Sequence, residues 1–261
     1  MSDTHAPIKR ISHFRFYEEL NDFLGKERCK KNFPVTFTGH PAVKDIIESL
    51  GVPHTEVDLI LVNSRSVDFN YKLQGGEQIS VYPVFELLDI TSLQHLRPKP
   101  LRNNRFIADV NLGKLARMLR LLGFDTLYQN NYTDTEIIRI AAKEKRIILT
   151  RDRGILKHHA VTHGYWIRNH LPERQLTEII EYFHLQNCIA PFIRCSICNG
   201  LLHPVDKKDI IDRLPKRTAE YHNSFVECDC CHKIYWKGSH YPVSYTHLRA
   251  HETSLHLVCR L

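Results

Sequence analysis

Hydrophobic and polar residues in the middle of the chain follow the pattern of strands alternating with helices. Residues 105–108 form a short apolar run, and apolar side chains then recur at helical spacing through residues 112–122. Gly123 stands where a glycine ends many helices, and residues 124–128 form a second apolar run. This order predicts a βαβ unit with parallel strands.

The alternation continues toward the carboxyl terminus. A helix is expected to begin at Thr133 or Asp134, because either residue can serve as its N-cap. Residues 146–150 form an unbroken β-branched run, which is typical of a strand covered on both faces. Residues 164–168 predict a further strand, and residues 172–183 predict a further helix.

A different order of elements is predicted for the amino-terminal part of the chain. Strands are expected at residues 13–17, 33–38, 59–63 and 78–84, with a helix at residues 41–50 between the second and third strands. Strand, strand, helix, strand, strand is the order of a β-grasp fold, in the α+β class. The predicted architecture is therefore an α/β domain with a parallel sheet that follows a β-grasp domain.

Three aspartates stand next to the ends of these predicted elements. Asp109 and Asp152 each follow a predicted strand, and Asp134 stands at the start of a predicted helix. Active groups in open parallel sheets gather beyond the carboxyl ends of the strands, so we expect the three carboxylates to lie together. Clustered carboxylates repel one another unless a hard divalent cation neutralises them. The pattern predicts a site for Mg²⁺ or Mn²⁺.

Each of these acids also has a purely structural interpretation. Asp134 can simply cap a helix, and Asp109 and Asp152 can be polar turn residues after strands. Glu136 is a further candidate for metal contact and catalysis, or else a solvated glutamate in the first turn of a helix. One aspartate alone would carry no weight, whereas three at the correct ends of successive elements favour the metal site.

Basic residues accompany the aspartates. Five of them are candidate substrate-binding residues: Lys114, Arg117, Arg120, Arg151 and Arg153. Basic groups beside an acidic metal site suit a polyanionic substrate. A divalent metal can polarise a phosphodiester, activate an attacking water and stabilise the leaving oxygen. The combination therefore points to phosphodiester hydrolysis.

Four downstream cysteines form two C-x-x-C pairs, Cys195 with Cys198 and Cys228 with Cys231. Each pair can place two thiolates on one tight turn, and two facing turns supply the tetrahedral four-sulfur shell that Zn²⁺ prefers. With all four positions filled by protein, such a metal has no open site for catalysis. The predicted role of the zinc is structural, and scattered reduced thiols or disulfides are the alternative.

Aromatic and histidine residues surround the second cysteine pair. Tyr235 and Trp236, with Lys237, could stack on and pair with RNA. They could equally form the core of a small zinc-binding module. His232 and His240 are spare metal donors, and we expect them to be surface groups.

The segments around the aspartates resemble a known family. The runs DVNLGKLARMLRLLGFDT, TDTEI and AAKEKRIILTRDRGIL look like the RNase domain of the Mut-seven C-terminal family, which belongs to the PIN-like nucleases. The resemblance extends over residues 102–241 and includes the two cysteine pairs, which look like the zinc ribbon of that family. It implies a PIN-like α/β/α fold and a metal-dependent ribonuclease whose carboxylates are Asp109, Asp134 and Asp152.

One feature departs from the family pattern. PIN-type sites usually carry a fourth acid, whereas Arg153 and Gly154 follow Asp152 here. Glu136 is the candidate for that role, or the site binds one metal weakly.

The amino-terminal part resembles the ubiquitin-like domain that precedes the RNase domain in many members of the family. Related sulfur-carrier proteins need a free diglycine terminus, but Gly75 and Gly76 lie in a loop ahead of a strand. These two residues are better interpreted as turn glycines. This domain can therefore have a role in binding a protein partner or in positioning. The alternative is that it is a plain structural appendage.

These observations divide the chain into five parts. They are a ubiquitin-like β-grasp domain at 1–96, a basic, proline-stiffened linker at 97–102, a PIN-like RNase domain at 103–190, a zinc ribbon at 191–241 and a tail at 242–261. The tail contains VSYTHLRAHET, which resembles a translated sequencing-library adapter and is expected to be an artefact. A histidine-rich metal-binding tail is the alternative.

Composition adds little to this picture. The formal charge of +7 fits a nucleic-acid partner without proving one. No apolar run is long enough to span a membrane, and residues 1–10 lack the apolar core of a signal peptide. Cysteines clustered in pairs indicate zinc in a reducing compartment, so the cytoplasm is expected.

The sequence predicts a cytoplasmic metal-dependent ribonuclease that acts on RNA, with Mg²⁺ or Mn²⁺ at the aspartates and Zn²⁺ at the cysteines. A catalytically inactive RNA- or protein-binding module is the alternative. The sequence gives no oligomeric state.

Overall fold

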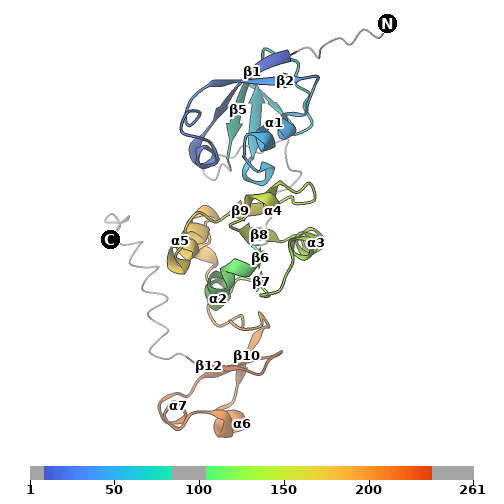
Figure 1. Ribbon diagram of the computed structural model, residues 1–261. Coiled ribbons are helices and arrows are strands. Elements are labelled where there is room, and N and C mark those ends of the chain that lie inside the picture. The colour runs from blue at the N-terminus through green and yellow to red at the C-terminus, as the bar shows by residue number, and fades with distance from the viewer. Residues whose placement is uncertain (1–8, 84–103, 237–261) are drawn as a thin grey trace, which may run out of the picture. The chain divides into compact units, whose positions relative to one another are not determined.

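The computed structural model describes residues 9–83 and 104–236 (Figure 1). The chain divides into two compact units, the first of residues 1–103 with 133–166 and the second of residues 104–132 with 167–261. The predicted linker at 97–102 and the predicted tail at 242–261, like Lys237 and His240, lie outside the described residues. None of the helices in the described ranges is long and apolar enough to cross a membrane.

The amino-terminal part of the first unit is a five-stranded sheet. Its strands are β1 (Lys9–Phe16), β2 (Phe33–Thr38), β3 (Leu59–Val62), β4 (Arg65–Val67) and β5 (Gln78–Tyr82). They lie in the order β2-β1-β5-β3-β4. The first strand pairs antiparallel with β2 and parallel with β5, and β3 pairs antiparallel with both β4 and β5. This topology confirms the predicted β-grasp fold.

Helix α1 (Val43–Ser49) packs against this sheet and buries Val43 and Ile47 (Figure 1). Strand β1 alternates between buried and accessible residues, so Phe14 and Phe16 enter the core while Arg15 between them is exposed. Each such buried side chain stabilises the fold by roughly 1.5–3 kcal/mol. The predicted strand is confirmed, and it begins earlier than expected, at Lys9.

Two short 3-10 helices complete this part, η1 (Glu18–Phe23) and η2 (His54–Glu56). They follow β1 and α1 and were not predicted. Strand β4 was also missed, because three residues are too short for an alternating pattern to be visible.

The first unit also contains four elements from the middle of the chain. They are α3 (Asp134–Glu144), β8 (Ile147–Thr150), α4 (Arg153–Lys157) and β9 (Gly164–Trp166). All four residues of β8 are buried, as predicted for a strand covered on both faces, and β8 pairs parallel with β9. Thr133 is the N-cap of α3 and forms a capping box with Glu136.

The second unit contains strand β6 (Phe106–Ala108), η3 (Val110–Leu112), α2 (Gly113–Leu121), β7 (Thr126–Leu127), α5 (Pro172–Tyr182) and η4 (Gln186–Cys188). Strand β6 is buried throughout and pairs parallel with β7, which confirms the predicted βαβ unit. The strands of the RNase region follow the sheet order β7-β6-β8-β9.

Gly123 ends α2 in the way that the sequence predicts. Its φ is +95°, a left-handed conformation that suits glycine, and its N–H donates to the carbonyl of Arg120 at 2.9 Å. A Cβ at this position would lie 2.1 Å from the carbonyl oxygen of Ala190. The glycine is therefore required both by its backbone conformation and by close packing.

The carboxyl-terminal part of the second unit is a small antiparallel sheet. Strands β10 (Leu202–Val205), β11 (Phe225–Cys228) and β12 (Ile234–Trp236) lie in that order. Strand β11 pairs antiparallel with both neighbours. Between β10 and β11 the chain forms α6 (Lys207–Ile210), η5 (Ile211–Arg213) and α7 (Lys216–Tyr221).

Candidate functional site

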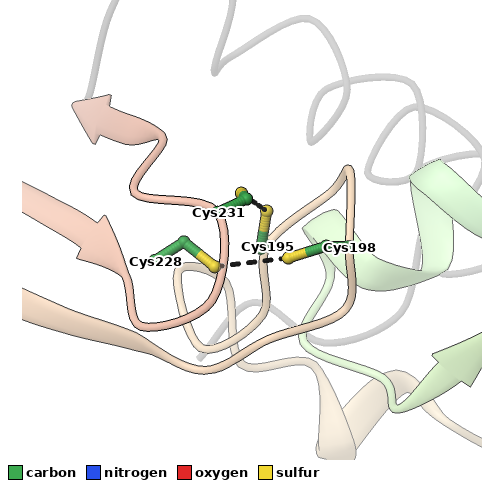
Figure 2. Close-up of side chains that lie close together, drawn as sticks. All are labelled: Cys195, Cys198, Cys228 and Cys231. Atoms are coloured by element: carbon green, nitrogen blue, oxygen red, sulfur yellow. Dashed lines mark hydrogen bonds between the residues drawn. The ribbon is translucent and has the colours of Figure 1, made fainter.

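Four cysteine sulfurs converge in the second unit (Figure 2). The Sγ atoms of Cys195, Cys198, Cys228 and Cys231 all lie within 4.8 Å of one another. Cys195 is 3.5 Å from Cys231, and Cys198 is 3.4 Å from Cys228. A tetrahedron with Zn–S bonds of about 2.3 Å has sulfur–sulfur edges of about 3.8 Å. The predicted four-sulfur cluster is therefore present, with dimensions that fit Zn²⁺.

Each cysteine pair lies on a tight backbone turn. The N–H of Asn199 donates to the carbonyl of Cys195 at 3.0 Å, and the N–H of His232 donates to the carbonyl of Cys228 at 3.1 Å. Asn199 and His232 both adopt positive φ, 68° and 55°. Such values are several-fold enriched in asparagine and histidine. A side chain at Gly200 would lie 2.9 Å from the sulfur of Cys228. The sequence thus permits the close approach of the two turns.

Tyr235 belongs to the surroundings of the cysteine cluster. Its Oη lies 3.0 Å from Sγ of Cys195 and accepts the N–H of Ser196 at 3.2 Å. Burial raises the pKa of the Cys195 thiol, but the hydrogen bonds from Tyr235 and from the loop N–H groups outweigh it and hold the pKa at about 6. The ring of Trp236 lies 6.5 Å from the ring of Phe225. Both aromatics therefore contribute to the module itself, which favours the core interpretation over RNA stacking.

Arg120 has a structural setting in α2. Its side chain is buried, with Nε donating to the carbonyl of Thr126 at 2.7 Å and Nη1 donating to the carbonyl of Ile197 at 2.7 Å. Burial lowers the pKa of this guanidinium. The side chain joins α2 to the first cysteine turn.

Asn199 is a neighbour of the cysteine cluster that the sequence analysis does not predict. Its Oδ1 accepts the N–H of Thr126 at 3.0 Å, and its Nδ2 donates to Oδ1 of Asp125 at 2.8 Å. Arg194 lies 3.5 Å from the same carboxylate. The sequence signal that could have identified Asn199 is its position directly after the first C-x-x-C pair. The cysteine module is thus fastened to the end of β7 by several polar contacts.

Asp109 lies directly after β6, as predicted. Asp109 is only 5% exposed, and its Oδ1 accepts the N–H of Val110 at 2.6 Å. The aspartate thereby acts as the N-cap of η3. Lys114 and Arg117 stand exposed on α2, the helix that follows. A buried carboxylate at the carboxyl end of a buried strand, followed by exposed cations, is the arrangement expected of a site for an anionic substrate.

Asp134 and Glu136 lie exposed in the first turn of α3. Oε2 of Glu136 accepts the backbone N–H of Thr133 at 2.8 Å and its hydroxyl at 2.9 Å. The backbone hydrogen bond and then the hydroxyl lower the pKa of the Glu136 carboxyl. The structure therefore shows Glu136 as a helix-capping residue, while Asp134 stands beside the cap.

Asp152 lies two residues after β8 and is exposed. Its Oδ1 accepts the N–H of Gly154 at 2.7 Å, and its own N–H donates to the hydroxyl of Thr150 at 2.9 Å. A Cβ at Gly154 would lie 3.0 Å from Oδ1 of Asp152. The glycine therefore leaves space for this N-cap. Arg151 beside it is also exposed.

The cysteine cluster is the metal-binding group that the structure brings together. Across residues 9–83 and 104–236, the four cysteines are the one group of three or more His, Cys, Asp or Glu side chains whose ligand atoms lie within 4.8 Å of one another. The convergence of Asp109, Asp134 and Asp152 stays a prediction.

Comparison with family models identifies both parts of the chain. The Mut7-C RNAse domain matches residues 104–248, and the Mut7-C ubiquitin domain matches residues 9–89. The chain belongs to the Mut7-C RNAse domain family. Family and domain order agree with the resemblance that the sequence motifs carry. Neither the curated proteins nor the solved structures gave a match to this chain.

The residue ranges of the two Mut7-C matches can be compared with the predicted domain limits. The Mut7-C ubiquitin match contains all five strands of the β-grasp sheet. The Mut7-C RNAse match contains all three aspartates and all four clustered cysteines. It also includes residues 242–248, the first part of the tail predicted to be an artefact.

Arg153 of the Mut7-C RNAse domain is engaged by aromatic rings. Its guanidinium carbon lies 3.9 Å from the centroid of Trp166 and 4.9 Å from that of Phe23. Nη2 donates to the carbonyl of Asp22 at 3.5 Å. These contacts are within the first unit and bind the α4 turn to the Mut7-C ubiquitin domain.

Proposed function

We propose that this member of the Mut7-C RNAse domain family is a metal-dependent ribonuclease. The observation that carries the proposal is the family match over residues 104–248, which contains Asp109, Asp134 and Asp152. In the proposal these three carboxylates hold Mg²⁺ or Mn²⁺. Carboxylate oxygens are the ligands that these cations take in proteins, so the donor chemistry fits. When bound, the cation would polarise the phosphodiester and lower the pKa of an attacking water.

The aspartates have local settings that support this assignment. Asp109 is buried after β6 and held by the N–H of Val110, so its carboxylate has a fixed orientation. Asp152 follows β8 and is held by the N–H of Gly154. Carboxylates oriented by backbone donors lose little freedom on binding a cation.

The proposal also requires groups that bind the anionic substrate, and exposed cations are available for this. Lys114 and Arg117 on α2 and Arg151 after β8 are accessible to solvent. We assign them to the phosphate groups of RNA, whose charge they would neutralise. Glu136 and Arg120 have capping and bridging contacts instead, and the proposal gives them no catalytic step.

The cysteine cluster has a separate role in the proposal. Its four sulfurs would hold a structural Zn²⁺ that keeps the two cysteine turns together beside β7. Thiolates that bind zinc need a reducing compartment, so we place the protein in the cytoplasm. RNA is the proposed substrate, and the Mut7-C ubiquitin domain is the proposed surface for any protein partner.

Cleavage of labelled single-stranded RNA tests the proposal. The full chain would be assayed with Mg²⁺, with Mn²⁺ and with chelator, beside Asp109→Asn and Asp152→Asn. The substituted amides keep an oxygen that can accept the capping N–H groups and lose the negative charge. We expect cation-dependent cutting that each substitution reduces at least 100-fold, with circular dichroism unchanged.

The second candidate function is an RNA- or protein-binding module without catalysis. The observation that favours it is that Asp109, Asp152 and Glu136 each accept a backbone hydrogen bond as capping residues, which gives these acids a structural role without a metal. Folded protein that binds RNA and does not cut it under either cation would support this alternative and overturn the ribonuclease proposal.

A further inference from the structure

The segment that carries Asp152 is held by the Mut7-C ubiquitin domain within the first unit. Four residues of this segment make the contacts: Arg153, Lys157, Val161 and Trp166. They lie on or beside α4 and β9, directly after the aspartate. The contacting residues of the ubiquitin domain lie on η1, on η2 and at the end of α1.

The apolar part of this interface surrounds a cation. The ring of Phe23 lies 4.9 Å from the ring of Trp166, tilted by 46°, and the guanidinium of Arg153 packs against both rings. Phe23 is buried, and Trp166 packs against the core of the ubiquitin domain. A guanidinium over aromatic faces is attracted by the ring quadrupoles, most strongly where water is excluded.

The polar part of the interface uses buried side chains. Glu56 is 1% exposed, and its Oε1 accepts the backbone N–H of Trp166 at 2.7 Å. His54 is also buried, and its Nε2 donates to the carbonyl of Val161 at 2.7 Å. Lys157 donates to the carbonyl of Glu48 at 3.1 Å. Leaving buried polar groups unpaired costs free energy. These hydrogen bonds therefore stabilise the contact between the ubiquitin domain and the α4–β9 segment.

Helix α4 depends on such support. It has five residues, too few for a helix that is stable by itself in water. Asp152 is its N-cap, so the direction of the Asp152 carboxylate follows the direction of α4. The residues that follow the aspartate are thus fixed by contacts with the ubiquitin domain.

We propose that the Mut7-C ubiquitin domain serves the RNase domain of its own chain, by docking through η1 and η2 on the α4–β9 segment and holding Asp152 in its working orientation. In this inference Arg153 is a positioning residue, and RNA phosphates are not its partner. The partner of this face is the segment 153–166, which already occupies it. The effect on cleavage rests on the proposed function, whereas the docking itself does not.

The test uses hydrogen exchange and RNA cleavage on the full chain. Arg153→Ala removes the cation from the aromatic pair, and Glu56→Ala removes the acceptor of the Trp166 N–H. Arg28→Ala is the matched control, because Arg28 is an exposed arginine whose guanidinium carbon lies 5.4 Å from the centroid of Phe33 within the ubiquitin domain. Circular dichroism and exchange in β1 and β2 report whether each variant is folded.

We expect both interface variants to exchange at least 10-fold faster than the unmodified chain over residues 151–166, while Arg28→Ala does not. Unchanged protection of this segment in both variants would overturn the docking proposal. For cleavage, we expect kcat to fall at least 10-fold with KM for RNA unchanged, because a displaced carboxylate impairs the reaction rather than binding.

Two further outcomes distinguish the docking proposal from the proposed ribonuclease function. A raised KM in Arg153→Ala with unchanged kcat would assign the arginine to phosphate binding and overturn its positioning role. Absence of cleavage by the unmodified chain under either cation would overturn the proposed function, and the exchange data would still decide the docking.

Discussion

Nη1 of Arg120 donates to the carbonyl of Ile197 at 2.7 Å, which joins helix α2 of the RNase domain to the first cysteine turn. The same guanidinium holds the carbonyl of Thr126 through Nε. One buried side chain therefore fastens the cysteine module to the parallel sheet. These two hydrogen bonds give the arginine a structural role.

Arg120→Ala should destabilise the chain by about 3 kcal/mol, because it leaves buried carbonyl groups without their donor. Urea denaturation of the zinc-loaded protein measures the change. Arg117→Ala is the control, since Arg117 is exposed on the same helix and should alter stability by about 0.5 kcal/mol or less. Equal effects of the two substitutions would contradict the bridging role.

The zinc site should require Cys228 and not Cys230. Cys228 belongs to the sulfur cluster, whereas Cys230 lies exposed outside it. We expect native mass spectrometry to find zinc on the unmodified chain and on Cys230→Ser, and none on Cys228→Ser. Retention of zinc by Cys228→Ser together with its loss from Cys230→Ser would show that the ligand set is different.

Glu136→Gln should leave RNA cleavage and its metal requirement unchanged within about 2-fold, because glutamine can fill the same capping-box position. The donors on Thr133 lower the pKa of the Glu136 carboxyl. The ionised form therefore stabilises α3 fully above the ordinary pKa of glutamate, and this contribution is lost as pH falls through the lowered pKa. Thermal denaturation across that acid range should show weaker pH dependence in Glu136→Gln. A large loss of cleavage would instead make Glu136 a metal ligand.

Gly123→Ala should destabilise the chain by about 3 kcal/mol or more, since it combines a positive φ with a clash against the carbonyl of Ala190. Gly39→Ala provides the comparison, because Gly39 also has positive φ but no neighbour within 4 Å of the added Cβ. Its expected cost is about 1 kcal/mol. Denaturant midpoints of the two variants measure the difference, and similar midpoints would show that packing at Gly123 is loose.

Much of the fold could be predicted because its signals are local. The strand at Ile147–Thr150 is a continuous apolar run, and Gly123 marks the end of its helix. The cysteine pairs define the sulfur cluster through their spacing alone. Helix α4 escaped prediction because five residues starting with Arg153-Gly154 give no helical period.

Other features depend on residues far apart in the chain. The sequence predicts Arg153 to bind phosphate because its neighbour is Asp152, and only the structure shows that its guanidinium lies over Phe23 of the Mut7-C ubiquitin domain. Arg120 looked like part of a basic helix face, but its acceptors lie on β7 and on the first cysteine turn. No sequence period reports such tertiary contacts, and the meeting of Asp109, Asp134 and Asp152 stays a prediction.

The cleavage of labelled single-stranded RNA by the unmodified chain and by Asp109→Asn tests the central claim most directly. The account predicts cutting with Mg²⁺ or Mn²⁺, none with chelator, and at least 100-fold slower cutting by a folded Asp109→Asn protein. Cutting that survives chelator or that Asp109→Asn leaves unchanged would contradict an aspartate-held metal, as would a folded chain that binds RNA and never cuts it.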